Sequence, residues 1–491
     1  MIGAPIRRQD PPSGEGTIKD RSRPGRSAFG FAPLDVPEVA IPEDARRRVE
    51  PGLPEVSEID LVRHYTRLSQ MNYGVDTGFY PLGSCTMKYN PKVAETVAAL
   101  PGFQRMHPLQ PDPTAQGALE MLWRLERALC EITGMARATL QPPAGACGEM
   151  TGLLIMRAYH QERGGGRTKV IIPDSSHGTN PASVHLAGFQ AVPVPSDARG
   201  LVDVSVLEKL VDDEVAGLML TNPNTLGLFE QEIEEIARIV HGVGGLVYYD
   251  GANLNAILGR CRPGDMGFDI VHINTHKTFA TPHGGGGPGA GPVGVVEELV
   301  PFLPAPIVQR DDATGSFRWD DDRPRSIGRL HGYHGNAAVL VRAYAYVFLH
   351  GADGLKAVSE LAALNANYLA ALISDEFPLA FPDGRPMHEF VATAKPLKDE
   401  TGIRAMDVAK RLIDLGYHPS TVYFPLVVDE AMMVEPTETE SKETLDRFIE
   451  VMQAIWREAE SEPETLRKAP HTRTIGRPDE VRAVKEPKVV V

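Results

Sequence analysis

The chain has 491 residues, of which 42% are hydrophobic, and this allows two or three domains with a large core. Its 65 acidic residues outnumber the 50 basic ones, and the formal net charge of −15 argues against nucleic-acid binding, which needs a concentrated basic face. No apolar run approaches the roughly 18 residues that a membrane span needs. Four scattered cysteines do not suit a disulfide framework or a C-x-x-C zinc site, and no apolar segment suits a secretory signal, so we expect a cytoplasmic protein.

The N-terminal part of the chain is expected to be extended. Residues 1 to about 56 are rich in Pro, Gly and Arg with little periodicity, which predicts an arm that needs a surface to lie on. A helix is predicted over residues 58–72, because four apolar positions recur at helical spacing: Ile59, Val62, Leu68 and Met71. Residues 74–92 predict a long structured loop, which is either a connector or a functional element.

A helix and a small-residue turn come next. The segment from Ala118 to Gly134 predicts an amphipathic helix that ends at Gly134. The turn from Ala144 to Gly148 predicts the start of a second helix, which runs to Glu162. Free backbone amides at a helix N-terminus bind anions, so this turn is a candidate phosphate site. The alternative is a plain tight turn whose glycines serve geometry alone.

Apolar runs then alternate with helical segments. Three runs end in polar clusters and predict buried strands: residues 168–177, 215–224 and 244–253. A helix is predicted between the last two, from Ile233 to Gly244. This alternation predicts an α/β fold with a mostly parallel sheet and helices on both faces. Ligands bind at the carboxyl ends of such strands, where we expect four side chains to meet: His177, Asn222, Asp250 and Lys277.

Lys277 follows a further short apolar run, Asp269 to Ile273, which predicts another buried strand. A lone lysine is usually a surface residue, but here glycines follow that allow the backbone to approach a ligand closely. Asp250 ends the preceding predicted strand and would face the same crevice. A lysine and a carboxylate so placed suit pyridoxal phosphate, because its aldehyde forms a Schiff base with the amine and its ring nitrogen needs an anionic partner.

Two competing interpretations of this region are weaker. Residues 284–289 formally match G-x-G-x-x-G, but Pro288 and Pro292 stand where the helix of a dinucleotide site would begin. His272 and His276 lie four residues apart, which would suit a metal on a helix. We place His272 on a strand, where this spacing does not converge in the same way, so no metal site is predicted.

The chain changes character beyond about residue 301. A glycine-punctuated loop is predicted to lead into a long helix within Ser326 to Gly351. Further helices, with brief strands at residues 388–393 and 420–428, predict a smaller α+β domain, and the tail from Ser461 predicts an arm. The expected organisation is therefore an arm and loop segment over 1–100, a large domain over 101–345 and a small domain over 346–491.

Five segments together resemble one known family: MNYGVDTGFYPLGSCTMKYNP, SSHGTNPAS, TNPNTLGLFE, YYDGANLNAI and THKTFATPHGGGGPGAGPVGV. The family is the glycine-decarboxylating P-protein of the glycine cleavage system, and the resemblance runs from about Glu58 to the tail. A full-length member is about twice as long as this chain. The chain resembles only the C-terminal, lysine-bearing half, which some members carry as a separate second subunit.

The resemblance implies a role for each matching residue. Lys277 would be the lysine that binds pyridoxal phosphate, and Asp250 would partner the pyridinium nitrogen. His177 would stack on the ring, and His276 precedes the lysine in a role that stays open. The remaining residues would contact the cofactor, under the ring, at its hydroxyl or along its phosphate: Ala252, Asn222, Ala146, Cys147 and Thr275. For Cys147 the backbone alone is a sufficient contact.

The resemblance also implies an activity and partners. Glycine would be decarboxylated and its aminomethyl group passed to the lipoyl arm of the H protein, in a heterotetramer of two copies of this chain and two of P-protein subunit 1. One alternative is another pyridoxal-phosphate decarboxylase or lyase of this fold; a cysteine desulfurase would need a loop cysteine, and none follows Cys261. The other alternative is a non-catalytic partner subunit, against which the intact Lys277 and Asp250 argue.

Overall fold

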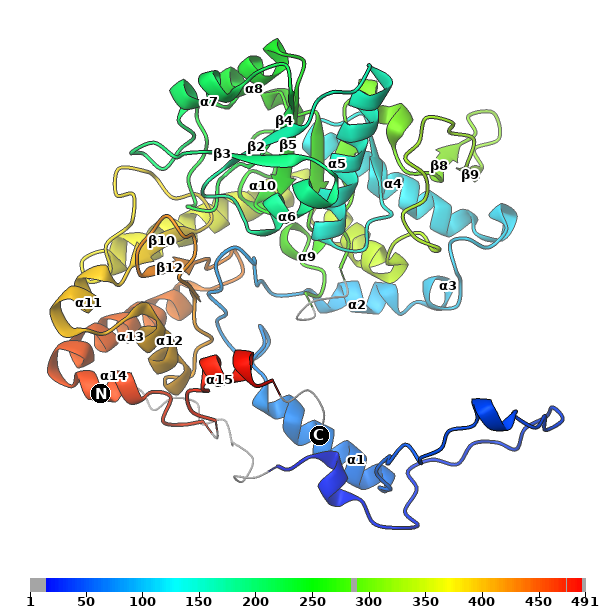
Figure 1. Ribbon diagram of the computed structural model, residues 1–491, viewed down its shortest axis with the longest axis horizontal. Helices are drawn as coiled ribbons and strands as arrows, with labels where there is room; N and C mark the ends of the chain where they lie inside the picture. Colours follow the sequence, from blue (N-terminus) through cyan, green and yellow to red (C-terminus); the bar gives the residue numbers. More distant parts are fainter. Residues whose placement is uncertain (1–14, 284–288, 474, 488–491) are drawn as a thin grey trace.

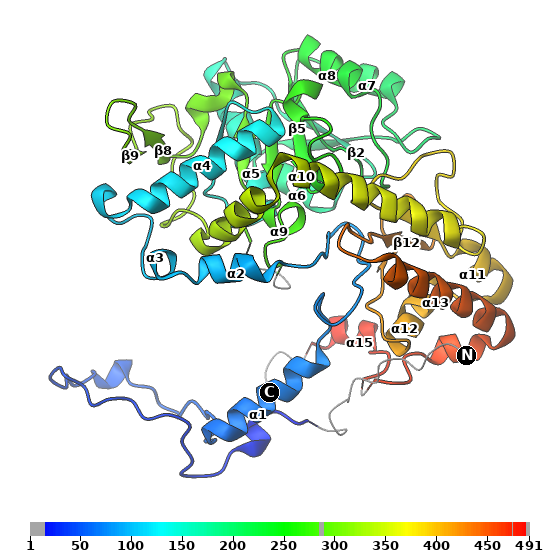
Figure 2. The same ribbon diagram turned by 180° about the vertical axis from the view of Figure 1, so that it is seen from behind.

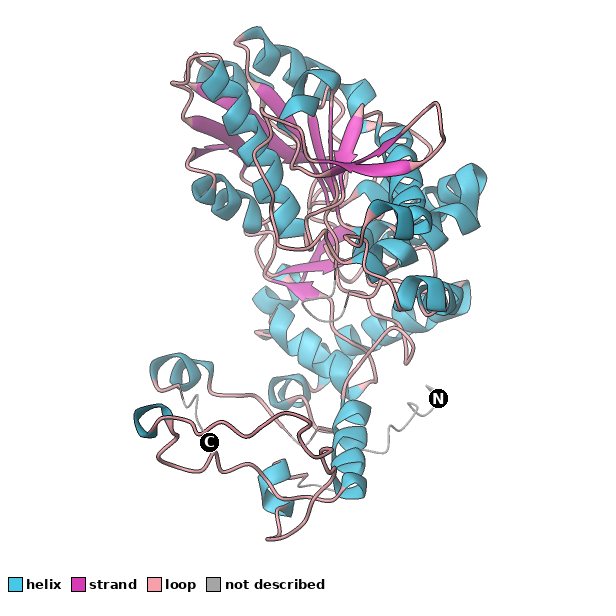
Figure 3. Cartoon of the chain, turned by 90° about the vertical axis from the view of Figure 1, so that its right-hand side faces the viewer, coloured by secondary structure: helices cyan, strands magenta, loops and turns pink. Residues whose placement is uncertain are grey.

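The computed structural model describes residues 15–283, 289–473 and 475–487. They form a large lobe around a seven-stranded sheet and a small lobe around a three-stranded sheet (Figure 3). One long helix, α10 (Ala337–Ile373), packs against elements of both lobes (Figure 2). The expected fold class, a mostly parallel α/β sheet with a smaller α+β unit, is confirmed. No helix in the described part of the chain is long and apolar enough to span a membrane.

The large sheet has the strand order β1-β7-β6-β5-β4-β2-β3. Five neighbouring strands are parallel: β3 (Gln190–Val194), β2 (Lys169–Pro173), β4 (Val215–Thr221), β5 (Leu246–Gly251) and β6 (Ile270–Ile273). The strand β7 (Val293–Val295) is antiparallel to both β6 and β1 (Arg137–Thr139). Every residue of β4, β5 and β6 is buried, as expected for strands that are covered on both faces.

Helices cover both faces of this sheet. The side chains of β2 alternate, so that Ile171 packs into one apolar cluster while Val170 and Ile172 pack into another on the opposite face. The helices α4 (Gln116–Thr133) and α8 (Ile233–Gly242) contribute to the first cluster, and α5 (Gly145–Glu162) and α6 (Thr179–Leu186) to the second. As predicted, α4 ends at Gly134, which adopts the left-handed conformation at φ 75°.

The remaining elements of the large lobe are short. Its helices are α2 (Lys92–Ala98), α3 (Pro101–Gln104), α7 (Val204–Leu210) and α9 (Thr275–Thr278), and its 3₁₀ turns are η3 (Asp112–Thr114), η4 (Leu254–Ala256), η5 (Pro263–Met266) and η6 (Glu297–Phe302). A hairpin of β8 (Ile307–Arg310) and β9 (Phe317–Asp320) lies at the edge of the lobe (Figure 1).

The small lobe contains an antiparallel sheet in the order β10-β12-β11, formed by β10 (Phe390–Thr393), β12 (Ala431–Val434) and β11 (Thr421–Val422). Its helices are α11 (Lys395–Thr401), α12 (Ala405–Asp414), α13 (Lys442–Ser461) and α14 (Pro463–Lys468), and α15 (Glu480–Lys485) follows. Large side chains such as Phe377, Phe390 and Phe448 are fully buried in the core of this lobe.

Two predictions for the C-terminal part are corrected. The strand expected over 420–428 is wrong beyond Val422, because Tyr423 adopts a positive φ of 59° and the chain turns back to form β12. The long helix expected within Ser326 to Gly351 is confirmed, since α10 begins at Ala337 and Gly351, which is not helical, interrupts it. The tail is not simply an arm, since Leu466 of α14 is fully buried. The predicted domain boundary at residue 345 falls within α10, and the division into domains stays a prediction.

The N-terminal segment projects from the rest of the molecule. It contains two 3₁₀ turns, η1 (Ile18–Arg21) and η2 (Glu43–Ala45), and the predicted helix, α1 (Glu58–Met71). Figures 1 and 2 both show α1 and residues 15–57 standing away from the two lobes. Glu15 fixes this segment to α1, because its carboxylate accepts hydrogen bonds from Arg67 and contacts His64 at 2.6 Å.

Candidate active site

The carboxyl ends of β4, β5 and β6 lie side by side. The register pairs Thr221 with Asp250 and Asp250 with His272, so these positions form one row across the sheet. Lys277 does not stand at the strand end itself, since it lies in the single-turn helix α9 that follows β6. The charge of Lys277 nevertheless contributes to lowering the pKa values of both Asp250 and His177, so the three residues share one site.

The amine of Lys277 is covered by the long loop over residues 72–91. The side chain is 8% exposed, and its Nζ donates a hydrogen bond of 2.8 Å to the carbonyl oxygen of Ser84. The sequence predicts a long loop over 74–92 that is either a connector or a functional element. Its contact with the lysine amine favours a functional element.

Asp250 is buried and held as a carboxylate. Its oxygens accept hydrogen bonds from Asn180 Nδ2 at 2.8 Å and from the backbone N–H of Ala252 at 3.0 Å, and His272 Nε2 lies 3.3 Å away. Burial alone would raise the pKa of Asp250, but His272, these hydrogen bonds and Lys277 together lower it below its ordinary value. An ionised carboxylate of this kind can hold a proton on a ring nitrogen.

His177 lies in the connection between β2 and α6, beside the row of strand ends. Burial and the charge of Lys277 lower its pKa, so the ring is neutral at pH 7. Its Nδ1 accepts a hydrogen bond from the backbone N–H of Thr179 at 3.2 Å and lies 2.9 Å from the hydroxyl of that residue. The ring is therefore fixed in orientation and contacts Phe424 edge-on at 5.8 Å between centroids.

The N-terminus of α5 offers a cradle for an anion. Its first intrahelical hydrogen bond runs from Gly148 N to Ala144 O, and no side chain caps the helix. Asn274 approaches so closely that a Cβ at Gly145 would lie 2.1 Å from its Oδ1. The buried Asn274 Oδ1 and His276 Nδ1 have no hydrogen-bond partner among the described residues. Free backbone amides beside the ring of His276, whose Nδ1 can carry a hydrogen, fit a phosphate group.

The other predicted contacts differ in how their polar atoms are engaged. Thr275 Oγ1 bonds Thr281 and the carbonyl of Ala290, and Cys147 Sγ points towards His331, at 3.7 Å from its Nε2. Burial raises the pKa of the Cys147 thiol, so it is not a thiolate at pH 7. Ala146 is exposed at the N-terminus of α5, and Ala252 is half-buried directly after β5.

The side-chain amide of Asn222 is engaged by the backbone of Glu230. Asn222 is fully buried, and its amide bonds both backbone groups of Glu230, at 2.9 Å to N and 3.4 Å to O. Only the second N–H of its Nδ2 is left to bind a ring hydroxyl, and that role stays a prediction. Among the glycines that follow Lys277, residues 284–288 lie outside the described residues.

His276 is adjacent to Lys277 and faces the same cradle. Burial, with smaller contributions from the charges of Lys277 and His283, lowers its pKa to about 3. Its ring is therefore a neutral hydrogen-bonding group at pH 7. A Cβ at Gly289 would lie 3.3 Å from its Nδ1, so this ring also lines the wall near the phosphate cradle.

Sequence reasoning missed a second buried lysine. Lys88, in the 72–91 loop, is 2% exposed, and its Nζ lies within hydrogen-bonding distance of four oxygens: Asn255 Oδ1 at 2.7 Å, Glu438 Oε1 at 2.8 Å, Thr278 O at 2.9 Å and Tyr346 OH at 3.3 Å. These contacts join the loop to α9, to α10 and to the small lobe. Nothing local in the sequence signals this, because Glu438 lies 350 residues further along the chain.

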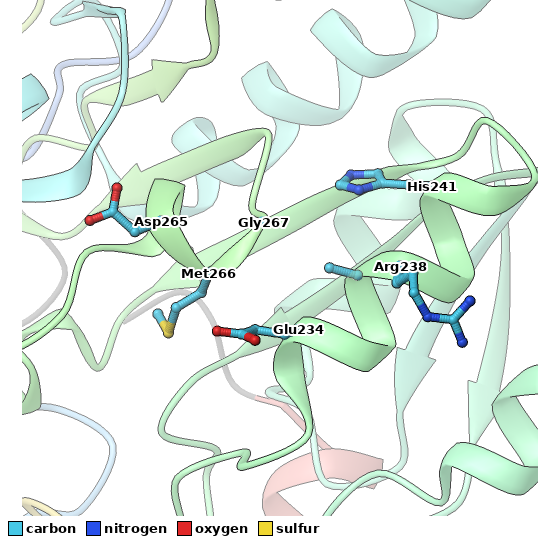
Figure 4. Close-up of a pocket in the computed structure, with 7 residues that line it drawn as sticks. Glu234, Arg238, His241, Asp265, Met266 and Gly267 are labelled. Atoms are coloured by element: carbon cyan, nitrogen blue, oxygen red, sulfur yellow. The ribbon is translucent and has the colours of Figure 1, made fainter.

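A separate surface hollow carries none of the predicted residues. It measures ≈ 370 Å³ and lies beside α8, lined by Glu234, Ala237, Arg238, His241, Asp265, Met266 and Gly267 (Figure 4). His241 is engaged by Asp269, which directly precedes β6. The hollow therefore lies where β6 begins, away from the carboxyl ends of the strands.

Comparison with known proteins gives matches along nearly the whole chain. The family described as Glycine cleavage system P-protein matches residues 26–320, and Glycine dehydrogenase, C-terminal domain, matches residues 358–471. A probable glycine dehydrogenase (decarboxylating) subunit 2 from Caldanaerobacter subterraneus subsp. tengcongensis is 56% identical over 476 residues, which cover 96% of this chain and 97% of that protein. The protein of the same name from Pyrococcus abyssi is 56% identical and matches 96% of this chain and 95% of its own length.

Solved structures share the fold at lower identity. An inhibitor-bound glycine decarboxylase (P-protein) of the glycine cleavage system superposes with a TM-score of 0.71 at 21% identity, over 84% of this chain and 93% of that one. A cysteine desulfurase from Thermococcus onnurineus NA1 gives 0.61 at 14% identity, over 78% and 95%. The architecture is that of fold-type-I pyridoxal-phosphate enzymes. The near full-length identity of 56% goes further than the fold, and the chain belongs to the family of glycine dehydrogenase (decarboxylating) subunit 2.

Proposed function

We propose that the chain binds pyridoxal phosphate at the carboxyl ends of β4, β5 and β6 and decarboxylates glycine. The aminomethyl group is passed to the lipoyl arm of the H protein. The observation that carries the proposal is the pair formed by an ionised aspartate near the carboxyl end of β5 and a buried lysine amine just after the neighbouring β6. Lys277 would hold the cofactor covalently, Asp250 its ring nitrogen, and the N-terminus of α5 its phosphate.

When bound, pyridoxal phosphate supplies an electron sink for the pair of electrons that the departing carboxylate of glycine leaves behind. The protein maintains that sink through Asp250, whose carboxylate holds a proton at the ring nitrogen. Asn180 and Ala252 donate to its two oxygens and so fix the direction in which it accepts. Asp250 thus contributes both charge and orientation.

His177 contributes orientation through its ring. The ring is neutral and tethered to Thr179, so it can stack on a planar group without adding positive charge. Such a platform limits rotation of the bound glycine, whose carboxylate leaves most easily when it stands perpendicular to the plane.

The 72–91 loop excludes water. Ser84 covers the amine of Lys277 on one side, and Lys88 seals the loop to the small lobe through Glu438. Water exclusion favours transfer to the lipoyl sulfur, because an early proton from water would end the reaction as methylamine.

The four cysteines suit a reducing compartment and bear on the alternative lyase function. All four are free, and we propose a cytoplasmic location. Cys85 lies beside Ser84, close enough for the charge of Lys277 to act on it, so it is the cysteine that a desulfurase activity would use. Burial raises the pKa of its thiol, which opposes the thiolate that such a nucleophile needs.

We also propose a heterotetramer of two copies of this chain and two of P-protein subunit 1. The relatives carry the words subunit 2 in their names, which implies a partner. The projecting N-terminal segment exposes large apolar side chains, among them Phe29 at 72%, Phe31 at 92% and Val39 at 85%. Apolar groups arranged in this way mark a surface that another chain covers.

The test uses the chain co-purified with subunit 1. Adding glycine should change the absorbance band of the lysine-bound cofactor, and glycine labelled at its carboxyl carbon should release labelled carbon dioxide only when lipoylated H protein is present. Cysteine in place of glycine should give no sulfide. Sulfide release, or a spectrum that glycine does not alter, would contradict the proposal.

A further inference from the structure

Three buried ionisable side chains lie between the small sheet and the 72–91 loop, and the proposed function uses none of them. His388 and Glu389 directly precede β10, and Glu435 directly follows β12, which pairs with β10. All three are 0% exposed. His388 Nε2 lies 3.7 Å from Glu389 Oε1 and 3.9 Å from Glu435 Oε1, which is too long for hydrogen bonds.

The two glutamates hold a short segment of the loop. Glu389 Oε2 accepts a hydrogen bond of 2.7 Å from the backbone N–H of Ser84, and Glu435 Oε2 accepts one of 2.9 Å from that of Thr86. The carbonyl of the same Ser84 accepts the hydrogen bond from Lys277. Residues 84–86 therefore connect the carboxyl pair to the lysine amine.

This segment is strained, which shows that its conformation is imposed. Ser84 and Thr86 have φ values of 65° and 47°, in the left-handed region that side chains other than glycine rarely adopt. Such a conformation persists only where surrounding contacts determine it, and it is concentrated at functional sites. The hydrogen bonds from the two carboxyl groups are contacts of that kind.

The charges around the pair do not balance if both carboxyl groups are ionised. His388 is neutral, because burial lowers its pKa to about 3, and burial keeps Cys85 as a thiol. Lys88 is already paired with Glu438 at 2.8 Å. Among the described groups that face the pair, Lys277 is then the cation available to balance it. Two ionised carboxylates would carry two negative charges against this one positive charge.

A proton resolves this imbalance. Two buried carboxyl groups in one site do not both ionise, and the proton then belongs to the pair. The pKa values agree: burial raises that of Glu435 to about 7, and burial together with the charge of Glu435 raises that of Glu389 well above its ordinary value. One proton leaves the pair with a single negative charge, which matches the ammonium of Lys277.

We propose that Glu389 and Glu435 form a positioning pair for Lys277, sharing one proton and one negative charge and fixing the Ser84 carbonyl against the lysine amine. The inference deepens the proposed function, on which its consequence rests, since Lys277 is the group that binds the cofactor there. The pair acts through residues 84–86 and through its charge. It fixes the group that accepts from the buried lysine amine and supplies the negative charge that faces it.

The test uses the substitutions Glu389→Gln and Glu435→Gln, separately and together, in the full-length chain without cofactor. Glutamine keeps a carbonyl oxygen that can accept the backbone N–H, so the loop segment stays held. Each single variant leaves one carboxyl group, which then carries the charge, and the double variant leaves none. A purely structural role predicts similar behaviour in all three variants.

Two measurements distinguish these outcomes. The infrared signal of buried protonated carboxyl groups at pH 7 should be weaker in each single variant than in the parent chain by one carboxyl group. Glu440, whose pKa burial also raises to about 7, contributes a background that all variants share. The rate at which an amine reagent labels Lys277 at pH 7 should stay near the parent value in both single variants. In the double variant it should rise about ten-fold or more, the effect of removing a nearby opposite charge from the amine.

The control is Glu126→Gln, at another buried glutamate that pairs with Arg127 and Arg137, and it should leave the carboxyl signal in place. Three results would overturn the proposal: a protonated carboxyl signal that neither single variant reduces, equal rates of Lys277 labelling in single and double variants, or a stoichiometric divalent cation in the purified chain. If the double variant fails to fold, the two single variants still decide through the infrared signal. No reading depends on glycine turnover, so the proposed function is tested separately.

Discussion

Asp250 and Glu389 are both fully buried carboxyl groups near Lys277, yet their surroundings move their pKa values in opposite directions. Burial raises both, but His272 and the Asn180 hydrogen bond outweigh burial at Asp250, whereas the second carboxyl group of Glu435 adds to burial at Glu389. Environments that separate two like groups in this way assign them different tasks. Asp250 suits a permanent anion, and Glu389 suits a group that keeps a proton.

Substitution of Lys277 tests the covalent attachment. Lys277→Ala should abolish the borohydride-reducible adduct with pyridoxal phosphate, because the amine beside Ser84 is the one that the site presents to the cofactor. Mass spectrometry of the reduced, digested protein measures this directly. Lys92→Ala, at an exposed lysine near the same loop, is the control and should label as the parent chain does. An adduct that survived in Lys277→Ala would place the attachment elsewhere.

Two substitutions at His177 separate ring stacking from proton chemistry. Phenylalanine keeps a flat ring, whereas alanine removes it, and both lose the contact with Thr179. If the ring acts as a platform, His177→Phe should retain far more single-turnover release of labelled carbon dioxide than His177→Ala. Both variants should still bind the cofactor. Equal, deep losses in the two would mean that the imidazole itself handles a proton.

At the scale of elements, α5 and the 72–91 loop serve two different parts of the site. The helix presents free amides towards a phosphate, and the loop covers the lysine amine. Neither the helix end nor the loop is held in place by its own local hydrogen bonds alone. Asn274 closes the helix end, and Lys88 fastens the loop to three other elements, so each is positioned by tertiary contacts.

The close approach at the start of α5 predicts a requirement for glycine. A Cβ at Gly145 would lie 2.1 Å from Asn274 Oδ1, so Gly145→Ala should cost about 1–3 kcal/mol of stability and weaken cofactor binding. Thermal unfolding and a spectroscopic cofactor titration measure the two effects. Gly117→Ala, where a Cβ in α4 would meet nothing within 4 Å, should be neutral or stabilising. Equal behaviour of the two variants would contradict the cradle geometry.

Because Lys88 and Glu438 form a buried pair, removing the lysine should cost much stability. A second substitution at Glu438 should restore part of it. Lys88→Met would leave Glu438 buried without its cation, at a cost of about 3–5 kcal/mol. Adding Glu438→Gln removes the uncompensated charge and should recover part of this loss. Denaturant unfolding of the single and double variants forms the measurement. A double variant that is less stable than Lys88→Met would show that the charge on Glu438 is satisfied by other groups.

At the scale of the whole molecule, the sequence reveals what is local. Periodicity predicts the strands β4, β5 and β6 and the helix α4. The motifs around Asp250 and Lys277 identify the carboxyl ends of the strands as the site. Lys88 and the Glu389–Glu435 pair could not be found in this way. Their contacts join residues that lie 167 to 350 positions apart, and periodicity carries no information about such distances. The strand β12 was missed for a related reason, because the turn at Tyr423 that redirects it has no glycine to mark it.

The exposed apolar face of α1 leads to a prediction about assembly. Its residues Ile59, Val62 and Tyr65 are 53%, 53% and 54% exposed and lie three positions apart, so they share one side of the helix. The opposite side carries His64, which is buried against Glu15. The helix is therefore fastened to its own N-terminal segment by one face and presents an apolar face that no described residue covers.

Serine at all three positions should leave the two lobes folded, because α1 stands apart from both (Figures 1 and 2), yet it should prevent stable association with subunit 1. Light scattering of the co-expressed pair after size exclusion would report the change from four chains to dissociated species. Leu186→Ser, at an apolar residue of α6 that is 74% exposed, is the matched control and should assemble normally. Since buried apolar area drives most association, a triple variant that still formed the full assembly would show that the contacts lie elsewhere on the chain.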